Sequence, residues 1–467
     1  MSADVASVDD LCAWANGQIV RGRGEQIFGG TKIDSREIVT GDLFVAIVGP
    51  NHDAHRFLGD VLAGGAAGAL VQMDRIEETV ARTDGFLVHV DDTTRALAAI
   101  AEGHRARFDG PLIGITGSNG KTTTKELCAG ILAVAGPTLA TRGNLNNAFG
   151  VPLTLLRRRA EDRYAVVEMG MNHRHEIAAL AEIAKPTIGV LTNVGTAHIE
   201  FLGSRENIAL EKGDLLVSLP ADGTAIVDRD EPLAFAQSER TEARVLTFGR
   251  SAHADLRASG ARFLDEGAFA FALETPFGRG EIKVSGLAET IVDNALAAAG
   301  GALAAGVSFE TVAEGLAAHR GVAGRMQPRP FPNDVLVIDD AYNANPQSMR
   351  SALETLARLD ASGARYAVLG QMGELGDEAP AAHDALGRLA GELGLDGLLL
   401  LGEYAEQTAG AAREAGLDDD RIVVGSDHES LARALQDRLG KGDRVLVKGS
   451  RAACMERVVE LLEEARR

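Results

Sequence analysis

The segment LIGITGSNGKTTTKEL, residues 112–127, constrains the fold of this 467-residue chain more than any other. It reads as a short apolar strand, a glycine turn and a helix that begins at the turn. Such an order gathers backbone N–H groups at a helix N-terminus, where partial positive charge favours a polyphosphate. We expect Lys121 to reach the terminal phosphates and Thr122 to place its hydroxyl on Mg²⁺. The full P-loop spacing is not met, because Ile115 stands five residues before Gly120.

The loop could also be a structural turn that binds nothing. We favour binding, because strand, turn, Lys-Thr and helix follow one another in the order that the mechanism demands. The residues that we expect to contact the polyphosphate are Gly117, Ser118, Asn119, Gly120, Lys121, Thr122 and Thr123.

Length and composition limit the class of protein. A chain of 467 residues predicts about three domains, and 45% hydrophobic with 24% charged residues is enough to build several cores. The net charge of −20 argues against nucleic acid or an anionic membrane as a partner. Anionic substrates would therefore need local attraction from backbone donors, a few basic side chains and bound metal.

The cysteines and the apolar segments bear on location. Cys12, Cys128 and Cys454 are scattered, which fits neither a disulfide framework nor a zinc site. The first ten residues are acidic where a signal peptide would be basic, and the most apolar run, 295–307, is too short to cross a bilayer. We expect a cytoplasmic protein with no membrane span that acts as a monomer.

The alternation of strand and helix patterns predicts an α/β protein of three domains. Residues 1–90 read as a small N-terminal α/β domain, and 91–318 as a central P-loop domain with a parallel sheet and antiparallel hairpins appended after residue 254. Residues 319–467 read as a C-terminal Rossmann-like domain. Its expected strands are 335–340, 366–371, 397–402, 421–426 and 444–449.

Two polar residues follow buried strands of the central domain, where ligands of open α/β sheets bind. Glu168 ends the apolar run 164–170, and His198 follows the run 188–195. A carboxylate at the end of a buried strand is costly unless it is paired, so we favour Glu168 as a magnesium ligand. His198 reads equally well as a hydrogen-bonded loop histidine.

Further polar groups have both a structural and a functional reading. The amides Asn144, Asn146 and Asn147 suit turns and caps, or recognition of a polar substrate beside the terminal phosphate. Lys212 lies on an expected helix, where most lysines are solvated. In IDDAYNANPQSM, residues 338–349, a turn and a helix start explain two or three polar residues, but not all of Asp339, Asp340, Tyr342, Asn343 and Asn345.

These motifs occur in an order that resembles the Mur ligases. The shared segments are TGSNGKTTTKE, TRGNLNNAFGVPLTLL, VVEMGMNHRHEI, TNVGTAHIEFLGS, LEKGDLL, GRM, DDAYNANPQSM and VKGSR. The resemblance spans all three domains and is closest to the type that adds a dipeptide. Residues 34–57 are similar to the segment of the family that binds the uridine nucleotide.

The resemblance implies an ATP-dependent amide ligase of peptidoglycan precursor synthesis. Its substrates would be UDP-N-acetylmuramoyl-tripeptide and D-Ala-D-Ala. The tripeptide carboxylate would take the γ-phosphoryl group of ATP to form an acyl phosphate, and the amine of D-Ala-D-Ala would then displace phosphate. Magnesium, expected as two ions, and Lys121 would neutralise charge on the transferring group.

Site roles carry over by position from the resemblance. Thr122 and Glu168 would hold the first magnesium, and His198 the second. Lys212 would be carbamylated and would ligate that second ion, so Lys121, His198 and Lys212 are the expected catalytic residues. Expected ATP contacts are Asn294 near adenine, with Arg325, Asp339 and Asn343 around the ribose and phosphates. Expected substrate contacts are Ser35, Arg36, Asn144, Asn146, Asn147, Tyr342, Asn345, Lys448, Ser450 and Arg451.

Some positions depart from the family pattern. Thr290 stands where histidine is frequent, Gln371 where Asp is usual, Asp228 where Asn is common and Ala54 where Gly is usual. None of them touches the phosphate loop or the expected metal positions.

Alternatives remain open at the level of sequence. A Mur ligase that adds the third amino acid would be expected to carry Asp-Asn-Pro-Arg in its last domain, and this chain lacks that motif. A folylpolyglutamate synthase shares the phosphate loop but not the N-terminal uridine domain. A non-catalytic nucleotide switch would bind nucleotide and form no product. For a ligase we expect hinge closure about residues 318–324.

Overall fold

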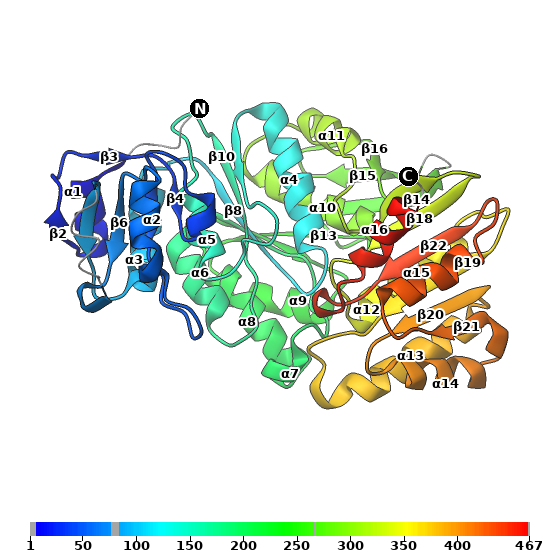
Figure 1. The fold of residues 1–467 in the computed structure, drawn as a ribbon. Coiled ribbons are helices and arrows are strands. Elements are labelled where there is room, and N and C mark those ends of the chain that lie inside the picture. The colour runs from blue at the N-terminus through cyan, green and yellow to red at the C-terminus, as the bar shows by residue number, and fades with distance from the viewer. Residues whose placement is uncertain (1–5, 76–83, 265–266, 466–467) are drawn as a thin grey trace.

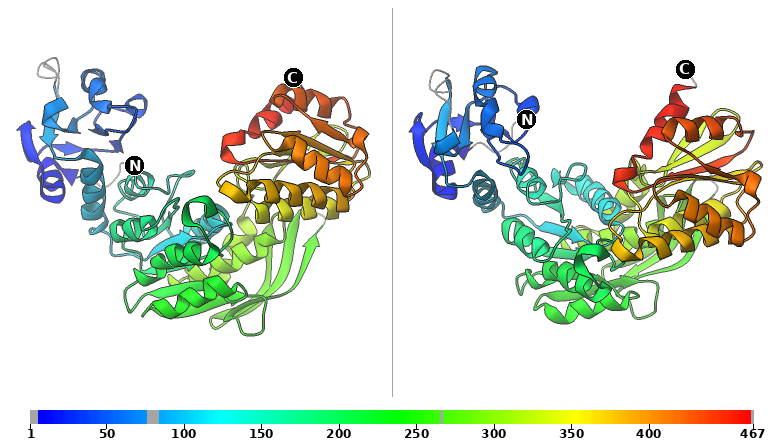
Figure 2. Two further views of the ribbon diagram at one scale, coloured as in Figure 1. Left: turned by 90° about the horizontal axis from the view of Figure 1, so that it is seen from below. Right: turned by 60° about the horizontal axis from the view of Figure 1, so that its bottom comes forward.

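The computed structural model describes residues 6–75, 84–264 and 267–465, and its three large sheets come from successive parts of the chain (Figure 1). We call them the first unit (residues up to 90), the central unit (91–318) and the third unit (319–465). Figure 2 shows the first and third units at opposite ends of the central unit and on the same side of it. Residues 1–5, half of the acidic N-terminal segment, lie outside the described part.

Helices flank the sheets of all three units. In the described part of the chain, none is both long and apolar enough to span a bilayer. The helices are α1 Val8–Ala15, α2 Leu58–Ala63, α3 Thr93–Arg105, α4 Lys121–Ala135, α5 Gly150–Leu155, α6 Glu176–Ala184, α7 Ile199–Leu202, α8 Arg205–Val217, α9 Pro232–Ala236, α10 Thr290–Ala304, α11 Phe309–Ala318, α12 Pro346–Arg358, α13 Ala379–Glu392, α14 Ala405–Glu414, α15 His428–Gln436 and α16 Glu456–Glu464.

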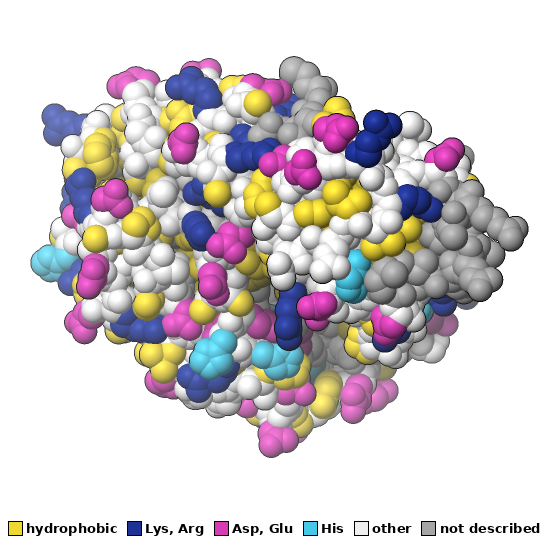
Figure 3. Space-filling model, turned by 90° about the vertical axis from the view of Figure 1, so that its left-hand side faces the viewer, with side chains coloured by type: hydrophobic (Ala, Val, Ile, Leu, Met, Phe, Trp, Pro, Cys, Tyr) yellow, Lys and Arg dark blue, Asp and Glu magenta, His cyan; other side chains and the backbone are white. Residues whose placement is uncertain are grey.

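The first unit contains a mixed sheet. The strands of this unit are β1 Ala6–Ser7, β2 Gln18–Arg21, β3 Ile27–Phe28, β4 Thr31–Lys32, β5 Leu43–Val45, β6 Gly68–Val71 and β7 Phe86–His89, of which β1 and β3 form a separate two-stranded sheet. The main sheet has the order β2-β7-β6-β5-β4, in which β2 is antiparallel to β7 and the others are parallel. Figure 3 shows the molecule from the side on which the first unit lies; on this surface, charged side chains of both signs are interspersed with scattered apolar ones.

The central unit contains the sheet that follows the phosphate loop. Its strands are β8 Leu112–Thr116, β9 Thr138–Ala140, β10 Tyr164–Glu168, β11 Ile188–Leu191, β12 Thr224–Asp228, β13 Arg244–Gly249, β14 Leu256–Leu264, β15 Ala268–Thr275 and β16 Gly278–Ser285. The order is β16-β15-β14-β13-β12-β11-β8-β10-β9. The strands from β8 to β14 are parallel, and β15 and β16 form the appended antiparallel hairpins.

Strands β10 and β11 end earlier than the apolar runs 164–170 and 188–195 predict. Glu168 pairs with Ile115 and Leu191 with Thr116, at the end of the central strand β8. Because β8 stops at the glycine turn, the residues that follow have no neighbouring strand to pair with. They form loops beside the turn instead, which places their side chains at the site.

Helix α4, which begins at the phosphate loop, packs against α10 and α11. The approach of α11 is close: a Cβ on Gly315 would lie 2.4 Å from the Cα of Ile131. Such packing fixes the first turn of α4, and with it the loop, against the sheet.

The third unit contains a doubly wound sheet. Its strands are β17 Gln327–Phe331, β18 Val335–Asp340, β19 Arg365–Gly370, β20 Gly397–Leu401, β21 Ile422–Val424 and β22 Arg444–Lys448, in the order β17-β18-β22-β19-β20-β21. The strands expected from the sequence are present within one or two residues. The antiparallel edge strand β17 was not expected, because Pro328 and Pro330 argue against a strand. Because the two prolines are two residues apart, both positions that lack an N–H group lie on the same side of the strand. An edge strand tolerates this arrangement.

Candidate active site

The phosphate loop depends on glycine at two positions. Gly117 has a φ of 152° and Gly120 a φ of 79°. A Cβ would lie 1.9 Å from Thr192 Oγ1 at the first position and 2.1 Å from Asn294 Oδ1 at the second. The Thr192 hydroxyl donates to the Asn119 carbonyl at 2.7 Å, which anchors the turn to the end of β11. Any side chain at either glycine would displace the loop.

Lys121 begins α4 and folds back over the loop. Its Nζ donates to the Gly117 carbonyl at 2.7 Å. Burial lowers the pKa of this ammonium, and the charge of Arg325 lowers it further, whereas Glu168 and Glu374 act in the opposite direction. The lysine is therefore held at the phosphate-binding surface by a carbonyl that a phosphate oxygen could replace as its acceptor.

Glu168 is 1% exposed and shares one carboxylate oxygen between two donors. Its Oε1 accepts from Asn146 Nδ2 at 2.7 Å and from Thr122 Oγ1 at 3.3 Å. Among the described residues, its buried Oε2 has no hydrogen-bond partner. An unpaired buried carboxylate oxygen is costly, and a hard cation with oxygen ligands would satisfy it. The geometry fits magnesium bound by Glu168 and Thr122 beside the loop.

The other two expected metal ligands, His198 and Lys212, line neither cavity, but the charge of Lys121 acts on the pKa of both. His198 precedes α7 with a left-handed φ of 66°, and its Nδ1 lies 2.6 Å from Glu374 Oε2. The pKa of His198 is lowered by burial first and then by the charges of Lys212 and Lys121, against the opposing effect of Glu374. His198 is therefore close enough to Glu374, Lys212 and Lys121 for their charges to affect its pKa.

Lys212 lies on α8 and is 1% exposed, so it is not a solvated helix lysine. No hydrogen bond or ion pair to its ammonium occurs within residues 6–75, 84–264 and 267–465. Burial lowers its pKa well below the ordinary value, the charge of Lys121 lowers it further, and the charge of Glu211 acts in the opposite direction. Its neighbour Glu211 is engaged elsewhere, since its carboxylate accepts from the backbone N–H groups of His175 and Ile177 at 2.6 and 2.9 Å.

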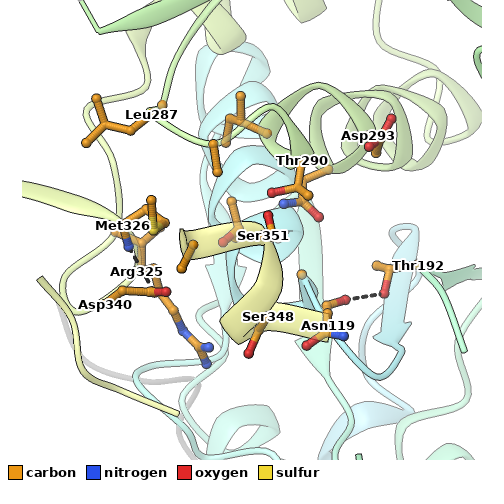
Figure 4. A pocket seen from close by; sticks show the side chains of 18 of the residues that line it. Asn119, Thr192, Leu287, Thr290, Asp293, Arg325, Met326, Asp340, Ser348 and Ser351 are labelled. Atoms are coloured by element: carbon orange, nitrogen blue, oxygen red, sulfur yellow. Dashed lines mark hydrogen bonds between the residues drawn. The ribbon is translucent and has the colours of Figure 1, made fainter. Parts of the chain in front are cut away.

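A cavity of about 500 Å³ opens beside the loop (Figure 4). Leu287 and Met326 give it apolar surfaces, and Thr290 and Asp293 bring polar groups from the start of α10. Asn294 also lines it, and its Oδ1 is within 3.4 Å of the Thr124 hydroxyl. A smaller cavity of about 60 Å³ continues over the loop and is lined by Ser118, Asn119, Gly120, Lys121, Thr122, Thr123, Arg325, Asn343, Asn345 and Ser348. The two spaces suit a nucleoside and its phosphates.

The third unit completes this surface. Asn345 caps α12 with its Oδ1, and its Nδ2 donates to Asn119 Oδ1 in the phosphate loop at 2.7 Å. The Arg325 guanidinium lies 4.1 Å from the centre of the Tyr342 ring. Asn343 lines the smaller cavity. Residues that lie far apart in the sequence therefore meet around the loop.

Asp340, rather than Asp339, lines the larger cavity. Asp340 accepts from Met326 N at 3.1 Å and from Lys448 Nζ at 2.6 Å, whereas Asp339 faces Arg329 at 3.4 Å on the opposite face of the sheet. Neighbouring residues on a strand point to opposite faces, and this alternation was the signal that could have distinguished the two.

The expected acceptor residues lie around the ends of β18 and β22. Lys448 is buried and held by Asp340 and by the Asn343 carbonyl at 2.9 Å. The buried hydroxyl of Ser450 has no hydrogen-bond partner among the described residues. Arg451 is exposed, and it pairs with Glu456 at 2.7 Å. An unpaired hydroxyl and an accessible guanidinium remain available to a ligand.

The structure does not bring the remaining expected residues into the cavities. Asn147 accepts from the N–H groups of Phe149 and Gly150 in the turn that leads into α5, which is the turn role left open by the sequence. Asn144 lines neither cavity; burial raises the pKa of the Tyr342 phenol in the third unit, and the nearby Asn144 side chain acts in the opposite direction.

Ser35 and Arg36 lie in the first unit, away from both cavities. The two residues begin a short 3₁₀ helix, and Arg36 pairs with Asp34 at 2.5 Å while its side chain stays exposed. Neither residue lines either cavity. A ligand that contacts them as well as the phosphate loop must be extended, or the first unit must move.

Comparison with known proteins agrees with this geometry. Residues 115–302 match the Mur ligase middle domain and residues 324–451 match the Mur ligase, glutamate ligase domain. A Synechocystis protein named UDP-N-acetylmuramoyl-tripeptide–D-alanyl-D-alanine ligase is 39% identical over 436 residues, which cover 92% of this chain and 90% of that protein. The chain belongs to the Mur ligase family.

Solved structures support the same assignment along the whole Mur ligase chain. MurF from Acinetobacter baumannii superposes with a TM-score of 0.89 at 32% identity, over 99% of this chain and 100% of that one. MurF from Thermotoga maritima in complex with ADP superposes with a TM-score of 0.79 at 31% identity, over 94% and 98%. The α/β fold class and the family expected from the motifs are confirmed.

Proposed function

We propose that this Mur ligase joins D-Ala-D-Ala to UDP-N-acetylmuramoyl-tripeptide and converts ATP to ADP and phosphate. The observation that carries the proposal is the unpaired carboxylate oxygen of Glu168, buried beside a loop that is shaped for phosphates. The names of the relatives supply the substrates, and the departures at Thr290, Gln371, Asp228 and Ala54 leave the loop and Glu168 intact.

The chemistry requires activation of an inert acid. A carboxylate is a poor electrophile, so its oxygen first attacks the γ-phosphorus of ATP, with ADP as the leaving group. The amine of D-Ala-D-Ala then attacks the carbonyl carbon of the acyl phosphate, the C–O bond to phosphate breaks, and the amine loses its proton. Positioning and charge neutralisation account for most of the acceleration in such transfers.

The residues of the chain have distinct tasks in this sequence. The N–H groups of the loop bind the phosphates, and Lys121 exchanges the Gly117 carbonyl for a phosphoryl oxygen as charge develops. Thr122 and Glu168 would hold a magnesium ion, which when bound neutralises part of the triphosphate charge. Among the described residues no three His, Cys, Asp or Glu side chains form a ready metal site. Magnesium sites that use substrate phosphates and water as ligands need fewer protein groups.

We propose that Lys212 is carbamylated and, with His198, holds a second magnesium ion. The support is a buried lysine whose ammonium makes no hydrogen bond or ion pair with any described residue. An uncharged amine adds to carbon dioxide and loses a proton, which turns a side chain unsuited to metal into one with two oxygen ligands. The modification would also give the buried site a negative charge to balance Lys121.

The substrates would be gripped from both ends. We assign Ser35 and Arg36 to the uridine diphosphate, and Ser450 and Arg451 to the carboxylate of the incoming dipeptide.

Residues 1–90, 91–318 and 319–467 would act as separate domains that close about the 318–324 linker. Gly321 and Gly324 in that linker have φ values of 87° and 66°, a conformation that glycine adopts freely. We also propose that the protein acts as a monomer in the cytoplasm.

Omission assays test the function. Phosphate release should require both UDP-N-acetylmuramoyl-tripeptide and D-Ala-D-Ala. The rival Mur ligase activity would instead need UDP-N-acetylmuramoyl-dipeptide and a free diamino acid, and a nucleotide switch would show binding without product. Release that is indifferent to every tripeptide and dipeptide supplied would overturn the proposal.

A further inference from the structure

The loop after β19 in the third unit reaches His198 in the central unit. Glu374 in this loop has a left-handed φ of 60°, and its Oε2 lies 2.6 Å from His198 Nδ1. The Glu374 carbonyl also accepts from the backbone N–H of Glu200 at 3.4 Å. Side chain and backbone of one residue therefore hold the segment that carries His198.

The loop itself is anchored within the third unit. The Gln371 carbonyl accepts from Ser450 N at 3.0 Å, and Met372 N donates to His383 Nε2 at 3.1 Å. These bonds fix the approach to Glu374, so the position of its carboxylate follows the position of the whole third unit.

Other polar contacts join the two units around the phosphate loop. Asn345 contacts Asn119, and the Thr196 hydroxyl donates to Gln347 Oε1 at 3.1 Å. In the central unit these contacts end on Asn119 and Thr196, neither of which is an expected metal ligand. The contact of Glu374 differs because it ends on a ring that the proposed function assigns to metal.

Carboxylate contact has a known consequence for a histidine ligand. It fixes the orientation and the tautomer of the ring and raises the basicity of the opposite nitrogen. Nε2 of His198 has no hydrogen bond among the described residues. Nδ1 lies 2.6 Å from Glu374 Oε2, within ion-pair distance, although the two groups are not aligned for a hydrogen bond. Nε2 is therefore the ring nitrogen left to accept a ligand.

We propose that Glu374 is a positioning residue for His198, supplied by the third unit to the magnesium-nucleotide site of the central unit. The inference rests on the assignment of His198 under the proposed function. It links domain position to chemistry: when the third unit moves away, the imidazole loses the carboxylate that orients it.

Metal binding tests this directly. Mn²⁺ affinity of the full chain with a non-hydrolysable ATP analogue is measured by electron paramagnetic resonance for the parent, Glu374→Ala and Glu374→Gln. Glu374→Ala should weaken Mn²⁺ binding about 10- to 100-fold and lower kcat, with KM for the sugar-nucleotide substrate changed less than about twofold. Glu374→Gln should fall between the two, since it keeps the shape of the contact and loses its charge.

A matched control and a double variant separate positioning from general damage. Glu200→Gln removes the same charge from the exposed neighbour and should leave Mn²⁺ affinity within about twofold of the parent. His198→Ala combined with Glu374→Ala should bind Mn²⁺ no more weakly than His198→Ala alone. Thermal unfolding establishes that each variant is folded. If Glu374→Ala is not folded, Glu374→Gln is used in its place for the comparison with the parent.

Parent-like Mn²⁺ affinity in folded Glu374→Ala would overturn the inference, as would an equal loss in Glu200→Gln or additive losses in the double variant. These outcomes are distinct from failure of the proposed function. Absence of acceptor-dependent phosphate release in the parent would end that function, while the Mn²⁺ measurements would still decide the role of Glu374.

Discussion

Replacing Asp228 by Asn is expected to stabilise the folded chain at alkaline pH. Asp228 ends β12 and lines the larger cavity, and its Oδ1 accepts from Asp230 N at 2.9 Å. Burial, followed by the negative charges of Asp293, Asp230 and Glu231, raises its pKa from 3.8 to about 7. Asn keeps the acceptor and removes the charge.

The sign and size of the pH effect on stability follow from the difference between the pKa of Asp228 in the folded chain and in the unfolded chain. Because the pKa is raised in the folded chain, the stability contributed by this carboxyl is fully present below pH 3.8 and is lost as the pH rises through about 7. At about 1.36 kcal/mol per pKa unit, the full loss is at most about 4 kcal/mol. The advantage of Asp228→Asn over the parent should therefore grow by about 3 kcal/mol between about pH 5 and about pH 8.

Hydrogen exchange of the β12 peptide, measured in a urea series at both pH values, reports the opening free energy of this sheet without requiring the whole chain to unfold in one step. Asp222→Asn removes the same charge from an exposed turn and should give no comparable growth with pH. The reasoning would be refuted if the difference in opening free energy between Asp228→Asn and the parent were independent of pH, or if it became smaller towards pH 8.

Further predictions concern the site. Lys121→Ala should lower kcat at least about 10²-fold with little change in thermal stability, because the ammonium contacts its own loop and acts on developing charge; a folded variant with parental turnover would contradict this role. Lys212→Ala should lose most activity and regain part of it when a short carboxylic acid supplies the missing oxygens, and a normal rate without the acid would remove the carbamate proposal. Small-angle scattering should show a more compact chain when an ATP analogue and the tripeptide substrate bind together, and unchanged profiles would count against closure about residues 318–324.

The sequence predicts most of the fold, because its signals are local. The apolar runs and the glycine turn define the strands and the loop, and the ends of β10 and β11 differ since pairing stops where β8 stops. Strand β17 was missed because its two prolines argue against a strand. They are tolerated only at the edge of a sheet, and the sequence alone does not show that β17 lies at an edge. Alternation along β18 could have separated Asp339 from Asp340.

Other features of the site depend on tertiary contact. The carboxylate of Glu374 meets His198 from another sheet, and no spacing between the two in the sequence announces that contact. The isolation of Lys212 is likewise visible only once α8 is packed. Asn147 illustrates the reverse case, in which a residue type common in binding sites holds the turn before a helix instead.

The central claim is that the phosphate loop and the third unit together activate the tripeptide carboxylate as an acyl phosphate. Isotope transfer tests it most directly: UDP-N-acetylmuramoyl-tripeptide labelled with ¹⁸O in its terminal carboxylate is turned over with ATP and D-Ala-D-Ala, and the released phosphate is analysed by mass spectrometry. Attack of the carboxylate on the γ-phosphorus predicts one ¹⁸O in each phosphate released. Phosphate that carries oxygen from water instead, or that is released at the same rate without D-Ala-D-Ala, would contradict the account.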